Sequence, residues 1–309
     1  MTSPSNLTAS IRQRLLNRSR EQNEDFSLTL IRYAIERLLY RLAQSVYADQ
    51  FVLKGAMLFV VWTNRTYRPT RDLDLAGYGD NSPDRLRKIF TEICELGVEP
   101  DGLVFEPNTI RITEIREEQE YPGQRVRLQA WLGRAQIPLQ IDIGFGDAIT
   151  PTPNEVEYPT MLNLPPPCLK VYPKETVVAE KLQAMVTLGM VNSRMKDFYD
   201  IWIMVQQFTF DGWKLAHAIQ ATFERRETEI PPILPVTITA KFGYDPEKRR
   251  LWQAFLERSR LEVDQLEFAE IVDQIAGFLN PPLTSIARHQ SFNKHWSPGR
   301  GWIKVTGDD

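Results

Sequence analysis

Two aspartates stand one residue apart in the segment 71–75, which reads Arg-Asp-Leu-Asp-Leu. Polar and apolar residues alternate here as in a β-strand, so Asp72 and Asp74 share one face and the leucines share the other. Two carboxylates at this spacing repel each other, and Mg²⁺ relieves such repulsion because it prefers one or two carboxylates together with waters and phosphate oxygens. The pair therefore predicts a metal site. A solvated strand face neutralised by Arg68 or Arg71 would give the same pattern.

A third aspartate, Asp142, lies in the alternating segment 139–145. The apolar residues of this segment share one face, and Asp142 lies on the other, beside Gly144, which leaves room close to the backbone. If this strand neighbours the strand of the aspartate pair, three carboxylates converge, as a two-metal site for phosphoryl or nucleotidyl transfer requires. The alternative is a buried aspartate that pairs with Arg125 or Arg127.

The motif Lys54-Gly55-Ala56 precedes the aspartate pair by a short interval. A glycine at a turn between a strand and a helix lets backbone N–H groups approach a phosphate. We therefore expect Lys54, Gly55 and Ala56 to contribute to nucleotide binding.

A last group of charged residues lies far downstream, around Lys181 and in the segment 193–200. Lys181 borders the apolar stripe of a predicted helix, from which it can reach a triphosphate as a point charge. Asp197 and Asp200 are three residues apart and share one helical face. We expect a salt bridge between Lys181 and Asp197 whether or not the lysine is catalytic, and this bridge would also orient the lysine.

Three arginines, Arg65, Arg68 and Arg71, crowd the approach to the aspartate strand. They have the charge to bind an RNA backbone, and they are equally suited to pair with the aspartates.

The elements that must position these residues follow from hydrophobic periodicity and turn signals. Helices are expected at 27–48, 83–96, 176–189, 196–207, 212–226, 246–260 and 264–279. The stretch 103–149 is rich in strand patterns and has a turn signal at Tyr121-Pro122-Gly123. The fold class is therefore α+β.

The domain organisation is predicted from the same pattern. Residues 1–150 form an α+β domain with N-terminal helices, and residues 151–280 form a mostly helical domain. The proline-rich stretch 150–173 is expected to be a linker or wrapped loop. Residues 281–309 are expected to form a loosely held polar tail.

Composition excludes several classes of protein. The 309 residues carry a net charge of −3, unlike a dedicated nucleic-acid coat protein, and this total leaves room for a local basic groove. Two cysteines and three histidines provide neither a disulfide framework nor a zinc site rich in cysteine or histidine. The lack of a disulfide framework favours a reducing, cytoplasmic setting. No signal-peptide core and no membrane-spanning apolar run is found.

With these residues in view, the chain resembles the AbiEii/AbiGii-type nucleotidyltransferase toxins, from the N-terminal helix to about residue 260. The resemblance is carried by segments 51–56, 68–75, 141–143, 175–184 and 193–200, in that order. The order of the segments is specific, whereas each segment alone is not.

The resemblance implies a polymerase-β-like nucleotidyltransferase fold, a mixed sheet with flanking helices, and a C-terminal helical region that completes the active site. It implies Mg²⁺, as two ions, and a nucleoside triphosphate. It further implies transfer of a nucleotide to a cellular target, which in close relatives is the acceptor end of tRNA, by the toxin of a toxin–antitoxin or phage-defence system. A cognate antitoxin is implied as the partner.

Roles are carried over by position. Asp72 and Asp74 would hold metal, and Asp142 would be the third carboxylate of the wider superfamily. Lys181 and Asp197 would match two later essential positions. Arg194, Lys196 and Asp200 belong to the same motif, and Arg194 and Lys196 join the three upstream arginines as candidates for RNA contact.

One departure concerns Ala56, because the wider superfamily often has Gly-Ser where this chain has Gly55-Ala56. Without that hydroxyl, triphosphate binding rests on backbone N–H groups and on Lys54 or Lys181. The missing serine leaves open a nucleotide-binding regulator with little catalysis. Nucleotide attachment to a protein target is a separate alternative.

Overall fold

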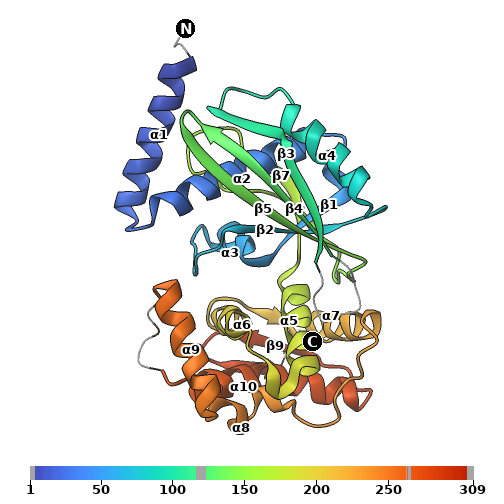
Figure 1. Ribbon diagram of the computed structural model, residues 1–309. Helices are drawn as coiled ribbons and strands as arrows, with labels where there is room; N and C mark the ends of the chain where they lie inside the picture. Colours follow the sequence, from blue (N-terminus) through green and yellow to red (C-terminus); the bar gives the residue numbers. More distant parts are fainter. Residues whose placement is uncertain (1–3, 116–122, 262, 264–265, 305–309) are drawn as a thin grey trace, which may run out of the picture. The chain divides into compact units, whose positions relative to one another are not determined.

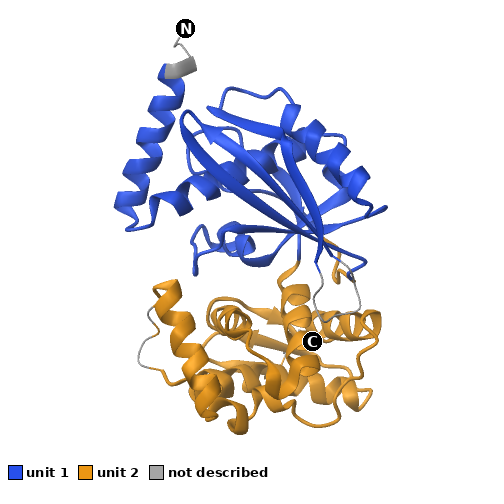
Figure 2. Ribbon diagram, viewed as in Figure 1, with its two compact units in different colours: residues 1–147, 154–172 blue, residues 148–153, 173–309 orange. Residues whose placement is uncertain are grey.

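The protein is described from a computed structural model that covers residues 4–115, 123–261, 263 and 266–304 (Figure 1). Two compact units are distinguished in Figure 2: unit 1 is Met1–Asp147 with Asn154–Tyr172, and unit 2 is Ala148–Pro153 with Pro173–Asp309. The expected boundary at residue 150 differs from this division, because the chain returns to unit 1 once more before it enters the helical part.

A seven-stranded mixed sheet forms the centre of unit 1, with strand order β3-β4-β5-β2-β1-β7-β6. β2 pairs in parallel with β5 and β1 with β7, while the other neighbours are antiparallel. The strands are β1 (Phe51–Lys54), β2 (Asp72–Gly77), β3 (Leu103–Ile115), β4 (Gly123–Leu132), β5 (Ala135–Phe145), β6 (Asn154–Glu157) and β7 (Cys168–Val171). The predicted α+β class is confirmed. The turn expected at Tyr121-Pro122-Gly123 lies outside the described residues except for Gly123, where β4 begins.

The helices of unit 1 bury one face of this sheet. They are α1 (Pro4–Glu21), α2 (Phe26–Gln44), α3 (Leu58–Thr63) and α4 (Pro83–Glu95), with short 3₁₀ turns η1 (Ala48–Gln50) and η2 (Gly55–Met57). α2 packs against β5 and α4 against β3. Asp25 caps α2 by accepting a hydrogen bond from the Leu28 N–H at 3.1 Å. The inward side chains of β4 and β5 alternate cleanly with polar ones, which leaves the opposite face of the sheet polar.

The expectation of a linker or loop at 150–173 is wrong in part, because β6 and β7 lie within it and extend the sheet. Each strand has only four residues. Prolines surround them, so the turn signals outweigh the short strand patterns in the sequence.

Two side chains of α2 fasten the segment between β6 and β7. A carboxylate oxygen of Glu36 accepts the Met161 N–H at 2.7 Å, and Arg37 donates to the Pro165 carbonyl at 2.7 Å. Both side chains are 1% exposed. A buried acidic and a buried basic side chain therefore hold irregular backbone in place inside unit 1.

Replacing Glu36 with Gln is expected to remove a loss of stability at higher pH. Burial raises the pKa of Glu36 to about 7, although the Met161 N–H and the Arg37 charge act in the opposite direction. The folded protein holds this proton more tightly than the unfolded chain, so stability falls as pH rises from 4.5, the ordinary pKa, to about 7. At 1.36 kcal/mol per pKa unit the loss is about 3 kcal/mol. Urea unfolding across this range measures it.

The matched control is Glu21→Gln, which removes an exposed carboxylate from the end of α1. An equally steep pH dependence in Glu36→Gln and in the parent protein would show that another group is responsible.

Unit 2 is mostly helical. Its helices are α5 (Lys174–Leu188), α6 (Met195–Gln207), α7 (Gly212–Arg225), α8 (Ala240–Gly243), α9 (Pro246–Ser259) and α10 (Phe268–Ala287), with 3₁₀ turns η3 (Gly189–Val191) and η4 (Val236–Ile238). A small sheet with order β10-β9-β8 accompanies them, made of β8 (Phe210–Asp211), β9 (Lys294–Ser297) and β10 (Gly301–Lys304).

The expected loose tail from residue 281 is wrong for the described residues. α10 continues through Pro281 and Pro282, and the following strands β9 and β10 form a hairpin. Pro282 has no N–H to donate to the Phe278 carbonyl, four residues earlier. The Trp302 indole N–H donates to that carbonyl instead, at 2.9 Å, and the Trp302 ring stacks on Phe278. A partner from β10 therefore offsets the defect that proline introduces.

None of the helices in the described ranges combines the length and the apolar character needed to cross a membrane.

Candidate functional site

The predicted aspartates stand in one row across the sheet of unit 1. Lys54 of β1 pairs in register with Asp74 of β2, and Asp74 pairs in register with Asp142 of β5. Side chains of residues paired across neighbouring strands lie on the same side of the sheet. The strand of the aspartate pair is therefore the neighbour of the Asp142 strand, which meets the condition stated for the three carboxylates. Asp72 lies two residues along the same face, opposite Gln140.

Gly55 lies directly against Asp74. It opens η2 at the end of β1, with φ +76°, a conformation that favours glycine. A Cβ at this position would overlap a carboxylate oxygen of Asp74 and come within 2.7 Å of the Asp74 Cβ. The expected turn between strand and helix is present, and only glycine lets the turn approach this carboxylate.

Gly55→Ala is expected to destabilise unit 1 by about 1–3 kcal/mol, because it combines an unfavourable φ with displacement of the Asp74 side chain. Gly97→Ala is the matched control, since a Cβ there meets nothing within 4 Å. Urea denaturation compares the two. Equal stabilities would mean that the turn rearranges without disturbing Asp74.

Asp142 is engaged by an arginine of the neighbouring strand β4. Arg125 donates through Nε to Oδ1 at 2.8 Å and through Nη2 to Oδ2 at 2.7 Å. Of the two arginines considered from the sequence, Arg125 is thus the partner, while Arg127 donates to Gln140 at 3.3 Å. A bidentate pair of this kind fixes the orientation of both side chains.

Sequence reasoning missed Asp147, which follows β5. Its carboxylate accepts Lys54 Nζ at 2.7 Å and the Tyr172 hydroxyl at 3.2 Å. A Cβ on Gly144 would come within 3.1 Å of both Asp147 Oδ2 and Lys54 Nζ. The space predicted beside Gly144 is therefore used by this ion pair. No alternation marks Asp147 in the sequence, because it lies beyond the strand.

Two of the three carboxylates on this face are suited to bind a hard cation such as Mg²⁺. Asp72 and Asp74 offer two carboxylates on one side of β2, which meets the requirement of Mg²⁺ for one or two carboxylates beside phosphate oxygens. Asp142 has both oxygens on Arg125. Within the part of the chain that the structure describes, no group of three His, Cys, Asp or Glu side chains is gathered as a metal site.

Unit 2 contains the second predicted group. Lys181 of α5 contacts Asp197 Oδ1 at 2.6 Å and Asp200 Oδ2 at 2.9 Å, both on α6. Arg194 Nε contacts the second oxygen of Asp197 at 2.8 Å. The expected bridge between Lys181 and Asp197 is confirmed, and it is part of a four-residue network.

The two aspartates of this network are almost completely removed from solvent, whereas the Arg194 side chain is partly exposed. The side chains of Asp197 and Asp200 are 2% exposed and that of Lys181 is 15% exposed. Burial alone would raise the pKa of Asp197, but the charges of Lys181 and Arg194 outweigh it and hold this pKa below its ordinary value. Asp197 is therefore a permanent anion that fixes the lysine.

The remaining candidates differ in their surroundings. Arg65, Arg71 and Lys196 are exposed, whereas Arg68 and Arg194 are partly buried. The aspartates lie in unit 1 and the lysine network in unit 2, so the predicted pocket common to both groups stays a prediction.

The chain is similar in sequence to one protein family and in fold to solved structures. The family model described as "Nucleotidyl transferase AbiEii toxin, Type IV TA system" matches residues 37–274, more than half of the chain. No curated protein matches significantly. Among solved structures, JHP933 from Helicobacter pylori is 14% identical, with a TM-score of 0.46 over 82% of this chain and 88% of that one. A candidate nucleotidyltransferase from H. pylori is 15% identical, with a TM-score of 0.43 over 82% of this chain and 90% of that one. On the family match, this chain belongs to the AbiEii nucleotidyltransferase toxins of type IV toxin–antitoxin systems.

Proposed function

We propose that the protein transfers a nucleotide from a nucleoside triphosphate to RNA, with tRNA as the acceptor, in a reaction that depends on Mg²⁺. The supporting observation is the row of Asp72 and Asp74 beside Gly55, at the turn where β1 ends. Family membership supplies the nucleotidyl transfer, and the two carboxylates supply the preference for magnesium.

In the proposed reaction a hydroxyl of the acceptor attacks the α-phosphate and pyrophosphate leaves. Asp72 and Asp74 would hold the metal, which when bound stabilises negative charge on the phosphates and activates the attacking oxygen. Backbone N–H groups at Gly55 and Ala56 would bind the triphosphate. Lys181, oriented by its aspartates, would neutralise phosphate charge.

Lys54 has a different place in this proposal from the one expected. Its ammonium is held by Asp147 at 2.7 Å and lies 5.5 Å from the centre of the Tyr172 ring. It would therefore act chiefly by fixing the end of β1, from which Gly55 begins.

Asp142 is proposed as the third carboxylate only when Arg125 releases it. Arg125→Gln should then tighten binding of Mg²⁺ by about tenfold, or roughly 1.4 kcal/mol. Calorimetric titration with Mg²⁺ in the absence of nucleotide measures this directly. Arg127→Gln, two residues along β4, is the control and should leave the affinity unchanged. Unaltered affinity in both variants would assign Asp142 to a purely structural ion pair.

RNA is the proposed acceptor because Arg65, Arg68 and Arg71 come from one loop just before β2. Phosphate contacts by arginines make binding steeply dependent on salt. RNA affinity that does not change with salt would contradict this part of the proposal.

The decisive experiment incubates the protein with each labelled triphosphate, Mg²⁺ and either total RNA or a protein extract. Label on an RNA of tRNA size supports the proposal. Label on protein instead would identify a protein acceptor. The family implies a cognate antitoxin, which we propose would suppress the reaction. We further propose that this system acts in the cytoplasm as a defence against phage.

A further inference from the structure

A cavity in unit 1 lies away from the aspartate row. It has a volume of about 430 Å³ and is enclosed by α1, α2, the end of α3 with the residues after it, and the segment that follows β6. None of Lys54, Asp72, Asp74 and Asp142 lines it. Its size lies within the range of small-molecule pockets, near the low end.

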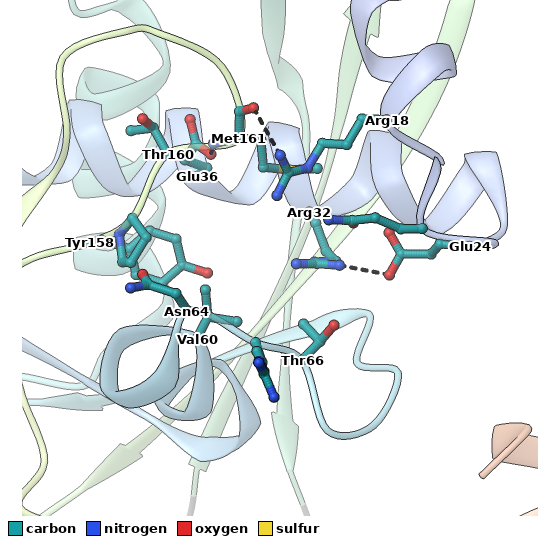
Figure 3. Close-up of a pocket in the computed structure, with 13 residues that line it drawn as sticks. Arg18, Glu24, Arg32, Glu36, Val60, Asn64, Thr66, Tyr158, Thr160 and Met161 are labelled. Carbon is teal, nitrogen blue, oxygen red and sulfur yellow. Dashed lines mark hydrogen bonds and ion pairs between the residues drawn. The ribbon is translucent and has the colours of Figure 1, made fainter. Parts of the chain in front are cut away.

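Arginines outnumber carboxylates on the wall of this cavity, by three to two. Arg18, Arg32 and Arg65 line it, and Figure 3 shows Arg18 and Arg32 reaching toward it from the two N-terminal helices. Arg32 forms an ion pair with Glu24 at 2.6 Å. Among the described residues, Arg65 has no ion-pair partner. The pKa of Glu36, raised by burial to about 7, leaves this second acidic group partly neutral near neutral pH. The cavity therefore has an excess of cationic groups.

Two residues that line the cavity also have buried polar atoms without hydrogen-bond partners among the described residues. Counting the residues described, Arg18 Nε is buried without a hydrogen-bond partner. Glu36 Oε1 is also buried without a hydrogen bond, although the Arg37 Nε lies 3.5 Å from it. The Arg18 guanidinium donates a hydrogen bond to the Met161 carbonyl, and this bond is long at 3.4 Å. Buried polar atoms without partners at a cavity wall are the groups that a ligand or ordered water satisfies.

Neutral polar groups complete the lining. Asn64, Thr66, Tyr158 and Thr160 surround the arginines, as Figure 3 shows. Guanidinium groups match phosphate oxygens, whereas carboxylates and amides match ribose hydroxyls and base amino groups. A phosphate ion would bind only to the guanidinium groups and would leave the carboxylates and amides without partners.

We propose that this cavity binds one phosphorylated nucleoside, either as a free nucleotide or as a residue of an RNA strand. Arg18 and Arg65 would bind the phosphate, and Glu24 and Glu36 would accept hydrogen bonds from the sugar or base. The choice of a nucleoside rests on the proposed function, while the phosphate preference rests on the arginines alone.

The test measures binding in EDTA, which removes any contribution of a metal at the aspartates. The probes are labelled AMP, by equilibrium dialysis, and a fluorescent ribo-oligonucleotide of six residues, by anisotropy. Arg18→Gln and Arg65→Gln should each weaken binding of the preferred probe by about tenfold, since hydrogen bonds to charged groups carry that much. Arg20→Gln, an exposed neighbour on α1, should change it less than about twofold.

The outcomes separate this proposal from the proposed function. Tighter binding of AMP identifies a free nucleotide, and tighter binding of the oligonucleotide identifies RNA. Either supports the cavity when Arg18→Gln weakens it, because Arg18 lines the cavity and does not belong to the loop before β2. Asp74→Asn should bind as the parent does in EDTA even when nucleotidyl transfer is lost. Failure of the parent protein to bind either probe would overturn the proposal, as would unchanged binding by Arg65→Gln, whose exposed side chain can be replaced without disturbing the fold.

Discussion

Asp74→Asn is expected to reduce nucleotidyl transfer by at least about 1,000-fold. The substitution keeps the shape of the side chain beside Gly55 but removes one of the two charges that would hold the metal. Metal stabilisation of the transferring phosphate is worth several kcal/mol, and each 1.36 kcal/mol is tenfold in rate. Transfer of label from the triphosphate measures the loss, and growth on expression should recover in parallel.

Asp84→Asn is the control for this result, because Asp84 is an exposed carboxylate on α4 in the same unit. Growth arrest that persists in the double variant Asp72→Ala/Asp74→Ala would refute the catalytic role of the pair. The thermal midpoint of each variant separates lost chemistry from lost folding.

Lys181→Met should destabilise unit 2 by about 3–5 kcal/mol, the usual effect of removing one partner from a buried ion pair. The substitution leaves Asp197 with Arg194 but leaves Asp200 without this cation, in a nearly solvent-free position. Two buried carboxylates then face each other across one turn of α6. Urea unfolding at neutral pH measures the difference.

Two further variants test the electrostatic origin of this loss. Lys196→Met removes an exposed lysine beside the network and should have little effect. Asp200→Asn, added to Lys181→Met, should restore part of the stability. If it restores nothing, the packing of the lysine stem rather than its charge is responsible.

The same network predicts a pH dependence. The pKa of Asp197 is held below 3.8, so its contribution to stability is present above that pH and is lost as pH falls further. In Lys181→Met, acidification instead relieves repulsion between the carboxylates. The gap between parent and variant should therefore narrow as pH falls toward about 4.

The sequence was sufficient where one periodicity governed a whole element. Alternation in 139–145 placed Asp142 on the polar face, and the structure confirms that face. The neighbouring strand was only a condition of the prediction, which the register of β2 and β5 meets. The helical spacing of Asp197 and Asp200 likewise put both carboxylates within reach of one lysine. These predictions needed only local geometry.

Contacts between residues far apart in the chain could not be predicted from the sequence. The sequence offered Arg125 and Arg127 as partners of Asp142, and only the register between β4 and β5 distinguishes them. Asp147 was missed because its partner Lys54 is 93 residues away. Four-residue strands among prolines were also missed, since pairing with the existing sheet stabilises them rather than their own pattern.

The Trp302 indole replaces the missing Pro282 N–H as the donor to the Phe278 carbonyl, and this affects the order in which the chain folds. The Phe278 carbonyl has no intrahelical donor, and the indole that serves it lies 24 residues further along. During synthesis the end of α10 leaves the ribosome before Trp302 does. The last turns of this helix therefore gain their full stability only after the hairpin of β9 and β10 has emerged, which makes the C-terminal strands the closing step of folding in unit 2.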